Sequence, residues 1–111
     1  MANYHRGRSF EQRVKEYLQS LGYYVMRSAS SKGIADLFAA KRGKGFLLQC
    51  AYSSASVCGK WGEVAGLARK TGLPMFMVTR DDDRSIIFMR VYGSGNLGAV
   101  WCDRPYGRNI A

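Results

Sequence analysis

The chain of 111 residues contains only eight Asp and Glu residues, so each can be weighed as a chemical group. Six are expected in solvated positions, namely a turn, two helix faces and the C-terminal tail (Glu16, Glu63, Asp81, Asp82, Asp83 and Asp103). The other two are Glu11 and Asp36. Asp36 is unusual because it interrupts an apolar run, where a carboxylate costs free energy unless something uses its charge.

Gln49 raises the same question, because it interrupts the apolar run 46–52. Purely structural interpretations also exist for the two acids. Asp36 could face solvent on the polar side of a hairpin, and Glu11 could be a first-turn acid that the helix dipole favours. The residue types alone leave these alternatives open.

The elements that would position these residues follow from apolar periodicity. Apolar residues at i, i+4, i+7, i+8 and i+11 predict a helix over 9–21, with Ser9 as N-cap and Gly22 after its end (Phe10, Val14, Tyr17, Leu18 and Leu21). Strands are predicted at 23–28, 34–40 and 46–52. A polar loop at 28–33 and a basic, Gly-containing turn at 41–45 separate them, so 34–52 should form a hairpin.

A second helix is predicted over 57–71, with an apolar face on one side (Val57, Trp61, Val64, Ala65 and Ala68). Strands at 75–79 and 85–92 follow, joined by a turn at 81–84. The order α-β-β-β-α-β-β indicates an α/β fold with a mixed five-stranded sheet flanked by helices. We expect one domain over 1–111, with 93–111 as a C-terminal extension.

A formal net charge of +9 favours a polyanionic partner, and nucleic acid is a better match than a membrane because the cations are dispersed. No run approaches the roughly 20 apolar residues of a membrane span, and the first ten residues contain no signal-like stretch. Three cysteines without a C-x-x-C pair and one histidine argue against zinc. We therefore expect a cytoplasmic protein, in the host cytoplasm if it is viral, with reduced thiols.

The motifs, taken in order, resemble the PD-(D/E)-x-K nuclease superfamily, and within it the archaeal-type Holliday junction resolvases. The matching segments are Gly7-Arg8-Ser9-Phe10-Glu11, Gly22-Tyr23-Tyr24-Val25-Met26-Arg27-Ser28, Ser30-Ser31-Lys32-Gly33-Ile34-Ala35-Asp36-Leu37 and Phe46-Leu47-Leu48-Gln49-Cys50-Ala51. They cover about residues 6–80 and exclude the tail. The resemblance implies a restriction-endonuclease-like core.

The resemblance also implies residue roles. Glu11, Asp36, Gln49 and the backbone carbonyl of Cys50 would hold Mg²⁺, a hard ion that prefers oxygen ligands, and Mn²⁺ could substitute. Such a metal polarises the scissile phosphate and lowers the pKa of the attacking water, and a lysine beside it stabilises the transition state.

Two residues depart from that pattern. Gln49 replaces a carboxylate with a neutral amide, whose oxygen can still bind a metal. Ala51 stands where the catalytic lysine is expected. Three explanations remain open: a degenerate nuclease, a migrated lysine such as Lys60, or deliberate removal of the lysine to trap an inactive enzyme. The last is favoured because the surrounding residues still resemble a working site.

DNA contacts are expected from cations and small polar residues that frame this site (Arg6, Arg8, Ser30, Ser31, Lys32 and Lys60). Cations of the turn at 41–45 are either contacts or simply solvated. A homodimer is expected because two-fold symmetry suits paired nicks on opposite strands. Its surface could use Val57, Trp61, Val64 and strand 86–91, which are equally compatible with core.

The leading hypothesis is a metal-dependent endodeoxyribonuclease that resolves four-way DNA junctions by paired nicking, impaired here by Ala51. One alternative is a non-catalytic DNA-binding module on a degenerate nuclease fold. Another is a PD-(D/E)-x-K nuclease that acts on branched or nicked duplex.

Overall fold

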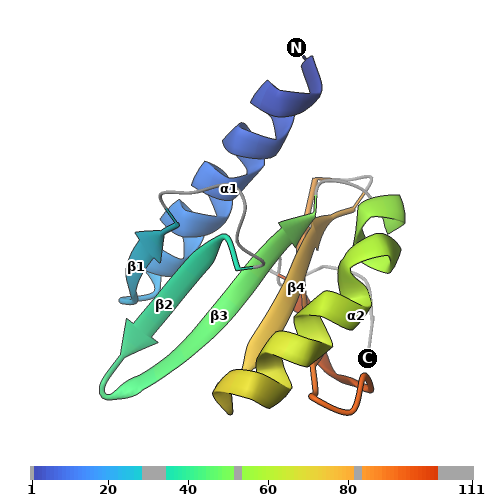
Figure 1. Cartoon of the computed structure of the whole chain (residues 1–111). Helices are drawn as coiled ribbons and strands as arrows, with labels where there is room; N and C mark the ends of the chain where they lie inside the picture. Colours follow the sequence, from blue (N-terminus) through green and yellow to red (C-terminus); the bar gives the residue numbers. More distant parts are fainter. Residues whose placement is uncertain (1, 29–34, 52–53, 82–83, 103–111) are drawn as a thin grey trace.

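The computed structural model describes residues 2–28, 35–51, 54–81 and 84–102. The described elements are α1 (Ala2–Ser20), β1 (Tyr24–Arg27), β2 (Leu37–Lys41), β3 (Lys44–Ala51), α2 (Ser54–Thr71), β4 (Met75–Arg80), β5 (Ile86–Val91) and β6 (Leu97–Cys102). The strands form one sheet in the order β1-β2-β3-β4-β5-β6 (Figure 1). Only the β3–β4 pair is parallel, with α2 as its crossover. The predicted mixed α/β architecture is confirmed.

The predicted count of five strands is wrong, because part of the expected C-terminal extension forms β6. This strand pairs antiparallel with β5 after a tight turn at 93–96. Gly98 allows the close approach, since a Cβ there would lie 2.5 Å from the ring of Tyr92. β6 is an edge strand, and Leu97 is 55% exposed. Its sequence therefore lacks the strong apolar pattern by which an interior strand is recognised.

The first helix is longer than predicted, because it begins at Ala2 and Ser9 lies inside it. The predicted apolar face is buried at Phe10, Val14 and Leu18, but Leu21 is 41% exposed. The helix ends before Leu21 in a Schellman arrangement, in which the N–H groups of Gly22 and Tyr23 donate to the carbonyls of Gln19 and Leu18. Gly22 has φ +95°, which glycine adopts without strain.

The two helices cover opposite faces of the sheet, and each face has its own apolar cluster. On the α1 face, Phe10, Val14 and Leu18 pack with residues of five strands (Val25, Leu37, Ala39, Leu48, Cys50, Val78, Ile86 and Phe88). On the α2 face, Val64, Ala65 and Ala68 pack with Ala51 and with residues of β4 and β5 (Met75, Met77 and Val91). The buried part of the predicted α2 face is thereby confirmed.

The predicted hairpin is present, with two adjustments. β2 begins at Leu37, so Asp36 lies immediately before the strand and not inside it. The turn is only two residues long, Arg42 and Gly43, both with positive φ, and Lys41 pairs with Lys44 across it. Gly45 is required next to this turn, because a Cβ there would lie 2.8 Å from the ring of Phe38.

The strand directions bring distant segments to one edge of the sheet. The C-terminal ends of β1 and β3 and the N-terminal end of β2 meet at the upper edge in Figure 1, and the Arg42–Gly43 turn lies at the opposite end. Neither of the described helices is both long and apolar enough to cross a membrane.

Candidate active site

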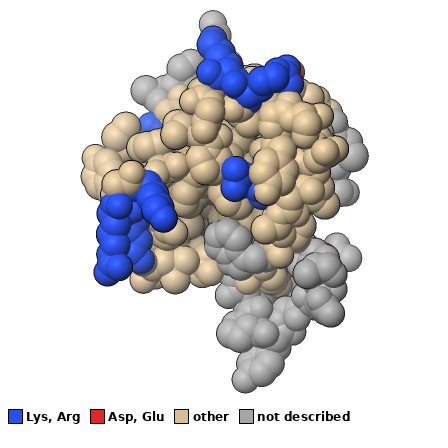
Figure 2. Space-filling view, turned by 90° about the horizontal axis from the view of Figure 1, so that it is seen from below, with Lys and Arg blue, Asp and Glu red and all other residues tan. Residues whose placement is uncertain are grey.

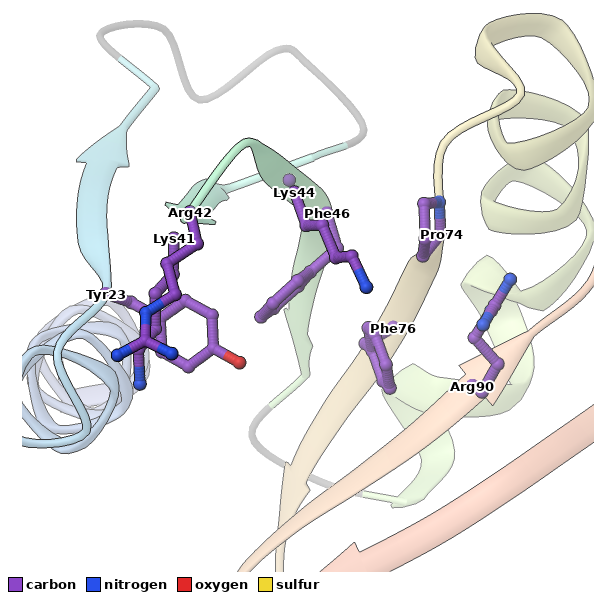
Figure 3. A pocket seen from close by; sticks show the side chains of 9 residues that line it. Tyr23, Lys41, Arg42, Lys44, Phe46, Pro74, Phe76 and Arg90 are labelled. Atoms are coloured by element: carbon purple, nitrogen blue, oxygen red, sulfur yellow. The ribbon is translucent and has the colours of Figure 1, made fainter.

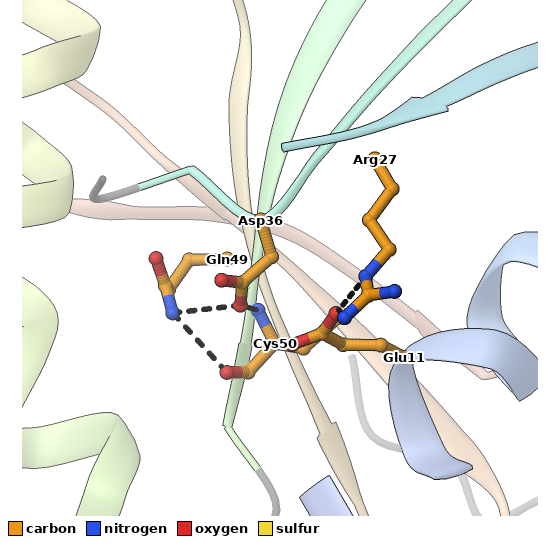
Figure 4. Close-up of polar contacts among 5 residues, drawn as sticks. All are labelled: Glu11, Arg27, Asp36, Gln49 and Cys50. Atoms are coloured by element: carbon orange, nitrogen blue, oxygen red, sulfur yellow. Dashed lines mark hydrogen bonds and ion pairs between the residues drawn. The ribbon is translucent and has the colours of Figure 1, made fainter. Parts of the chain in front are cut away.

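A polar cluster lies at the upper edge of the sheet and is made of Glu11, Arg27, Asp36, Gln49 and Cys50 (Figure 4). Asp36 is its centre. Its backbone N–H donates to the carbonyl of Leu48 at 2.9 Å, and its backbone carbonyl accepts from Ser28 at 2.8 Å. These two hydrogen bonds place Asp36 between β1 and β3, immediately before β2 begins. The carboxylate position is thus fixed by backbone pairing on both sides.

The carboxylate of Asp36 is held by two donors from β3. Its Oδ2 accepts from the Nε2 of Gln49 and from the backbone N–H of Cys50, both at 2.9 Å (Figure 4). Gln49 Nε2 also donates to the carbonyl of Cys50 at 3.2 Å. Two acceptors therefore fix the amide orientation. The Oε1 of Gln49 is buried and has no partner within the described part of the chain.

The environment raises the pKa of Asp36 to about 6. Burial is the largest cause, and the nearby charge of Glu11 raises the pKa further. The Cys50 N–H lowers it, as do the positive charges of Lys60 and Arg27. A half-buried carboxylate with a neighbouring acid, and with no described cation at bonding distance, is a favourable place for a metal ion.

Glu11 reaches the same edge from α1, and its Oε1 accepts from the Nε of Arg27 at 3.1 Å. Because α1 begins at Ala2, Glu11 lies in the middle of the helix and not in its first turn. The explanation that the helix dipole favours it there is therefore wrong, since that effect is confined to the terminal turn.

Arg27 is a site residue that was not predicted from the sequence. It is the last residue of β1, and its side chain points towards Glu11 (Figure 4). Its only sequence signal is a cation at the end of a short apolar strand. Its partner Glu11 lies 16 residues earlier, a pairing that no local pattern reveals.

Cys50 contributes through its backbone. Its thiol is buried in the α1-face cluster, and burial, followed by the charges of Asp36 and Glu11, raises its pKa well above the usual value. The thiol is thus protonated and apolar in character. Within the described ranges, no group of three or more His, Cys, Asp and Glu residues could hold a metal ion.

Ala51 lies on the same face of β3 as Gln49, as the strand alternation predicts, and that face packs against α2. It is 3% exposed. Lys60, on the same helix, is exposed and close enough to act on the charge of Asp36. The structure therefore brings Glu11, Asp36, Gln49, Cys50 and Ala51 together, with Lys60 nearby.

The side chains of the other predicted DNA-contact residues lie outside the described part of the structure. Arg6 and Arg8 belong to α1, but their side chains are outside the described part of the structure. The predicted loop residues Ser30, Ser31 and Lys32 also lie outside the described residues.

The residues offered for a dimer surface are largely core. Val64 is fully buried, as are Phe88 and Val91 of strand β5. Trp61 is half-buried, and its Nε1 donates to the carbonyl of Gly95 at 2.8 Å. Of the two interpretations that the sequence leaves open for this set, core is therefore the correct one for its buried members.

Comparison with known proteins identifies the family. The model of the archaeal Holliday junction resolvase (Hjc) family matches residues 2–90. This chain belongs to that family.

One relative and one solved structure are similar to parts of this chain. A crossover junction endodeoxyribonuclease Hjc from Methanocaldococcus jannaschii is 43% identical over 51 residues, which are 46% of this chain and 38% of the relative. The match thus spans well under half of the relative's length. The solved structure of Archaeoglobus fulgidus Hjc, a Holliday junction resolvase from an archaeal hyperthermophile, has a TM-score of 0.57 at 18% identity. It covers 74% of this chain and 70% of that one, and shows the shared fold.

Proposed function

We propose that this member of the Hjc family is a structure-specific endodeoxyribonuclease that nicks four-way DNA junctions with a divalent metal ion. The observation that carries the proposal is the carboxylate of Asp36, held half-buried by Gln49 and the Cys50 N–H, with Glu11 beside it. Such a protein would act in the cytoplasm, or in the host cytoplasm if it is viral.

The donor atoms at this edge fit a hard divalent ion. Asp36 keeps its Oδ1 and Gln49 keeps its buried Oε1 without a hydrogen-bond partner among the described residues, and Glu11 adds a second carboxylate. All of these are oxygens, which Mg²⁺ and Mn²⁺ prefer. We assign the metal to Asp36, Glu11 and Gln49, with the Cys50 carbonyl as a further candidate ligand.

The protein residues divide the remaining work. When bound, the divalent ion would polarise the scissile phosphate and lower the pKa of water. Gln49 Nε2 and the Cys50 N–H orient Asp36, and Arg27 holds Glu11 against the same edge. Lys60 supplies positive charge close to Asp36, where the transition state gains negative charge.

Ala51 is the position at which the proposed catalytic site lacks the expected lysine. A lysine at this position would share the face of β3 that carries Gln49, two residues away, from which its long side chain could reach a bound phosphate. We therefore expect this chain to bind junctions and cut them poorly. Ala51→Lys should raise junction cleavage on the order of 10²-fold, because one transition-state charge contact is restored.

The experiment compares the parent chain, Ala51→Lys and Ala51→Met on a four-way junction and on linear duplex, with Mg²⁺ and with Mn²⁺. Methionine is the matched control, because it overfills the buried position without adding a charge. The proposal predicts symmetric nicks by Ala51→Lys alone. Equal and efficient cutting by all three would instead point to a migrated lysine.

A non-catalytic DNA-binding module is the second candidate, and the buried alanine at position 51 favours it. Under this alternative neither the parent nor Ala51→Lys cuts any branched or nicked DNA, although both bind it. Preference for nicked or flapped duplex over the four-way junction would indicate a different nuclease specificity.

A homodimer is part of the proposal, because two active sites related by two-fold symmetry would nick two opposed strands. Sedimentation of the chain alone and with a junction tests it. Two chains on each junction are expected, and a single chain would remove the paired-nick mechanism.

A further inference from the structure

A second polar and aromatic site lies at the end of the sheet opposite Asp36. An open pocket of about 440 Å³ lies there, within the range of roughly 300–1,000 Å³ typical of small-ligand sites. It is lined by four cations and three aromatic rings, and no acidic residue is among its lining residues. None of the residues assigned to metal binding or catalysis contributes to it.

The aromatic wall is continuous. The ring of Phe46 contacts Tyr23 at 5.3 Å and Phe76 at 5.1 Å between centroids, both edge-on. Figure 3 shows these three side chains around the open space, with Lys44 extending between Phe46 and Phe76. Rings that pack edge-on leave faces on which a planar heterocycle can stack.

The positions of the hairpin cations are unfavourable for the stability of the folded protein. Lys41 and Lys44 are direct cross-strand partners, an arrangement in which like charges repel. Arg42 occupies a left-handed position in the two-residue turn, with φ 54°, where Asn, Asp or Gly are the usual residues. Arg42 and Lys44, held in these unfavourable positions, indicate a ligand of opposite charge.

The cations are also not neutralised within the described structure. Lys41 donates to the carbonyl of Leu21 at 2.6 Å and lies over Tyr23, so it closes the end of α1. Arg42, Lys44 and Arg90 form no ion pair with a described carboxylate. The guanidinium of Arg90 lies 4.8 Å from the ring centroid of Tyr92 and 6.0 Å from that of Phe76, and its Nε is buried without a hydrogen-bond partner among described residues. Figure 2, which views this end, shows separate groups of Lys and Arg and almost no acidic surface.

We propose that this pocket binds a nucleotide unit, with the base on the rings of Phe46 and Phe76 and the phosphate at Arg42, Lys44 and Arg90. The unit is either a free mononucleotide or the unpaired end of a DNA strand, and both present the same chemistry. An inorganic anion alone would leave the aromatic wall unused, and an apolar ligand would leave the cations unused.

The test uses the full chain and measures binding, not cleavage. Thymidine 5′-monophosphate, thymidine, inorganic phosphate and short oligothymidylates with and without a 5′-phosphate are titrated while backbone amide NMR shifts are recorded. The nucleotide should shift amides in β3 and β4 that line the pocket, and should bind more tightly than thymidine or phosphate. Tighter binding of the 5′-phosphorylated oligonucleotide than of the mononucleotide identifies the strand end as the natural source, and the reverse order identifies the free nucleotide.

Variants test the two halves of the pocket separately. Arg42→Gln with Lys44→Gln should weaken nucleotide binding at least about tenfold, and Phe76→Leu by about 5–10-fold with phosphate binding unchanged. The control is Lys15→Gln with Lys70→Gln, which removes the same charge outside the pocket. Equal losses in the control, or shifts confined to the Asp36 edge, would overturn the proposal. Because cleavage is not the readout, a failed nuclease assignment would leave this result interpretable.

Discussion

The two ends of the sheet are chemically opposite, although β3 runs through both. At its C-terminal end the strand supplies Gln49 and the Cys50 N–H to a half-buried carboxylate. At its N-terminal end it supplies Lys44 and Phe46 to a basic, aromatic pocket. Seven residue steps of about 3.3 Å separate Lys44 from Ala51, roughly 23 Å along the strand.

The contrast shows that the net charge of +9 does not describe either site. At the acidic end, burial and Glu11 penalise the ionised form of Asp36, and a bound cation would offset that penalty. At the basic end, the cations repel one another across a tight turn, and a bound anion would reduce that repulsion. One DNA ligand with a bound metal ion could balance the charges at both ends of the sheet. Whether the two ends bind their ligands independently can therefore be measured.

The largest effect should come from removing the charge of Asp36. In the Ala51→Lys background, Asp36→Asn should lower cleavage by about 10³-fold or more, because the proposed principal metal ligand would be lost. Junction affinity should be retained or increased, since a carboxylate repels phosphate when no metal is bound. Cleavage assays and binding titrations of both variants measure the two quantities.

Glu16→Gln is the matched control for this substitution, because Glu16 is an exposed acid on α1 outside the cluster. It should leave both quantities unchanged. If Asp36→Asn still cuts, the chemistry occurs elsewhere in the molecule and the upper edge is only structural. If Asp36→Asn abolishes nucleotide binding in the lower pocket, the two ends are coupled.

Much of this acidic end could be predicted from local sequence. Asp36 and Gln49 were detectable because each places a polar group in an apolar segment, and such a group must find a partner. The rest depends on tertiary contacts. Arg27 matters only because α1 brings Glu11 to it, and β6 forms because the edge of β5 accepts a weakly apolar segment. The pocket residues come from strands β2 to β5, with the turn that joins β2 and β3, and from the segments that precede β1 and β4, and they share no motif.

A smaller effect is expected at Lys60, the cation on α2 that acts on Asp36. In the parent chain, Lys60→Ala should reduce any residual cleavage by about tenfold, because it removes positive charge near the reacting phosphate. In the Ala51→Lys background the loss should be smaller, since the introduced lysine then supplies that charge. The double-mutant cycle measures this coupling.

Lys70→Ala serves as the control for Lys60→Ala, because Lys70 is an exposed cation in the last turn of the same helix. Equal effects of the two variants would mean that Lys60 contributes only to general attraction of DNA. Identical losses from Lys60→Ala in both backgrounds would show that the two lysines do not share a role.

The smallest effect concerns the stability of the metal-free chain. The folded-state pKa of Asp36 is about 6, against 3.8 for the free side chain. Between these values the folded state binds more protons than the unfolded state, so stability falls as pH rises, and the whole penalty is present above pH 6.

Asp36→Asn removes this penalty while its side-chain oxygen still accepts from Gln49 and Cys50. With EDTA present, thermal unfolding should therefore show Asp36→Asn more stable than the parent above about pH 6, on the order of 5 °C after allowing for solvent screening. The difference should disappear only below about pH 3, where Asp36 is protonated in both the folded and the unfolded state. Glu16→Gln should show no such pH-dependent gain, and an Asp36→Asn gain that is constant with pH would show that burial does not penalise the charge at this edge.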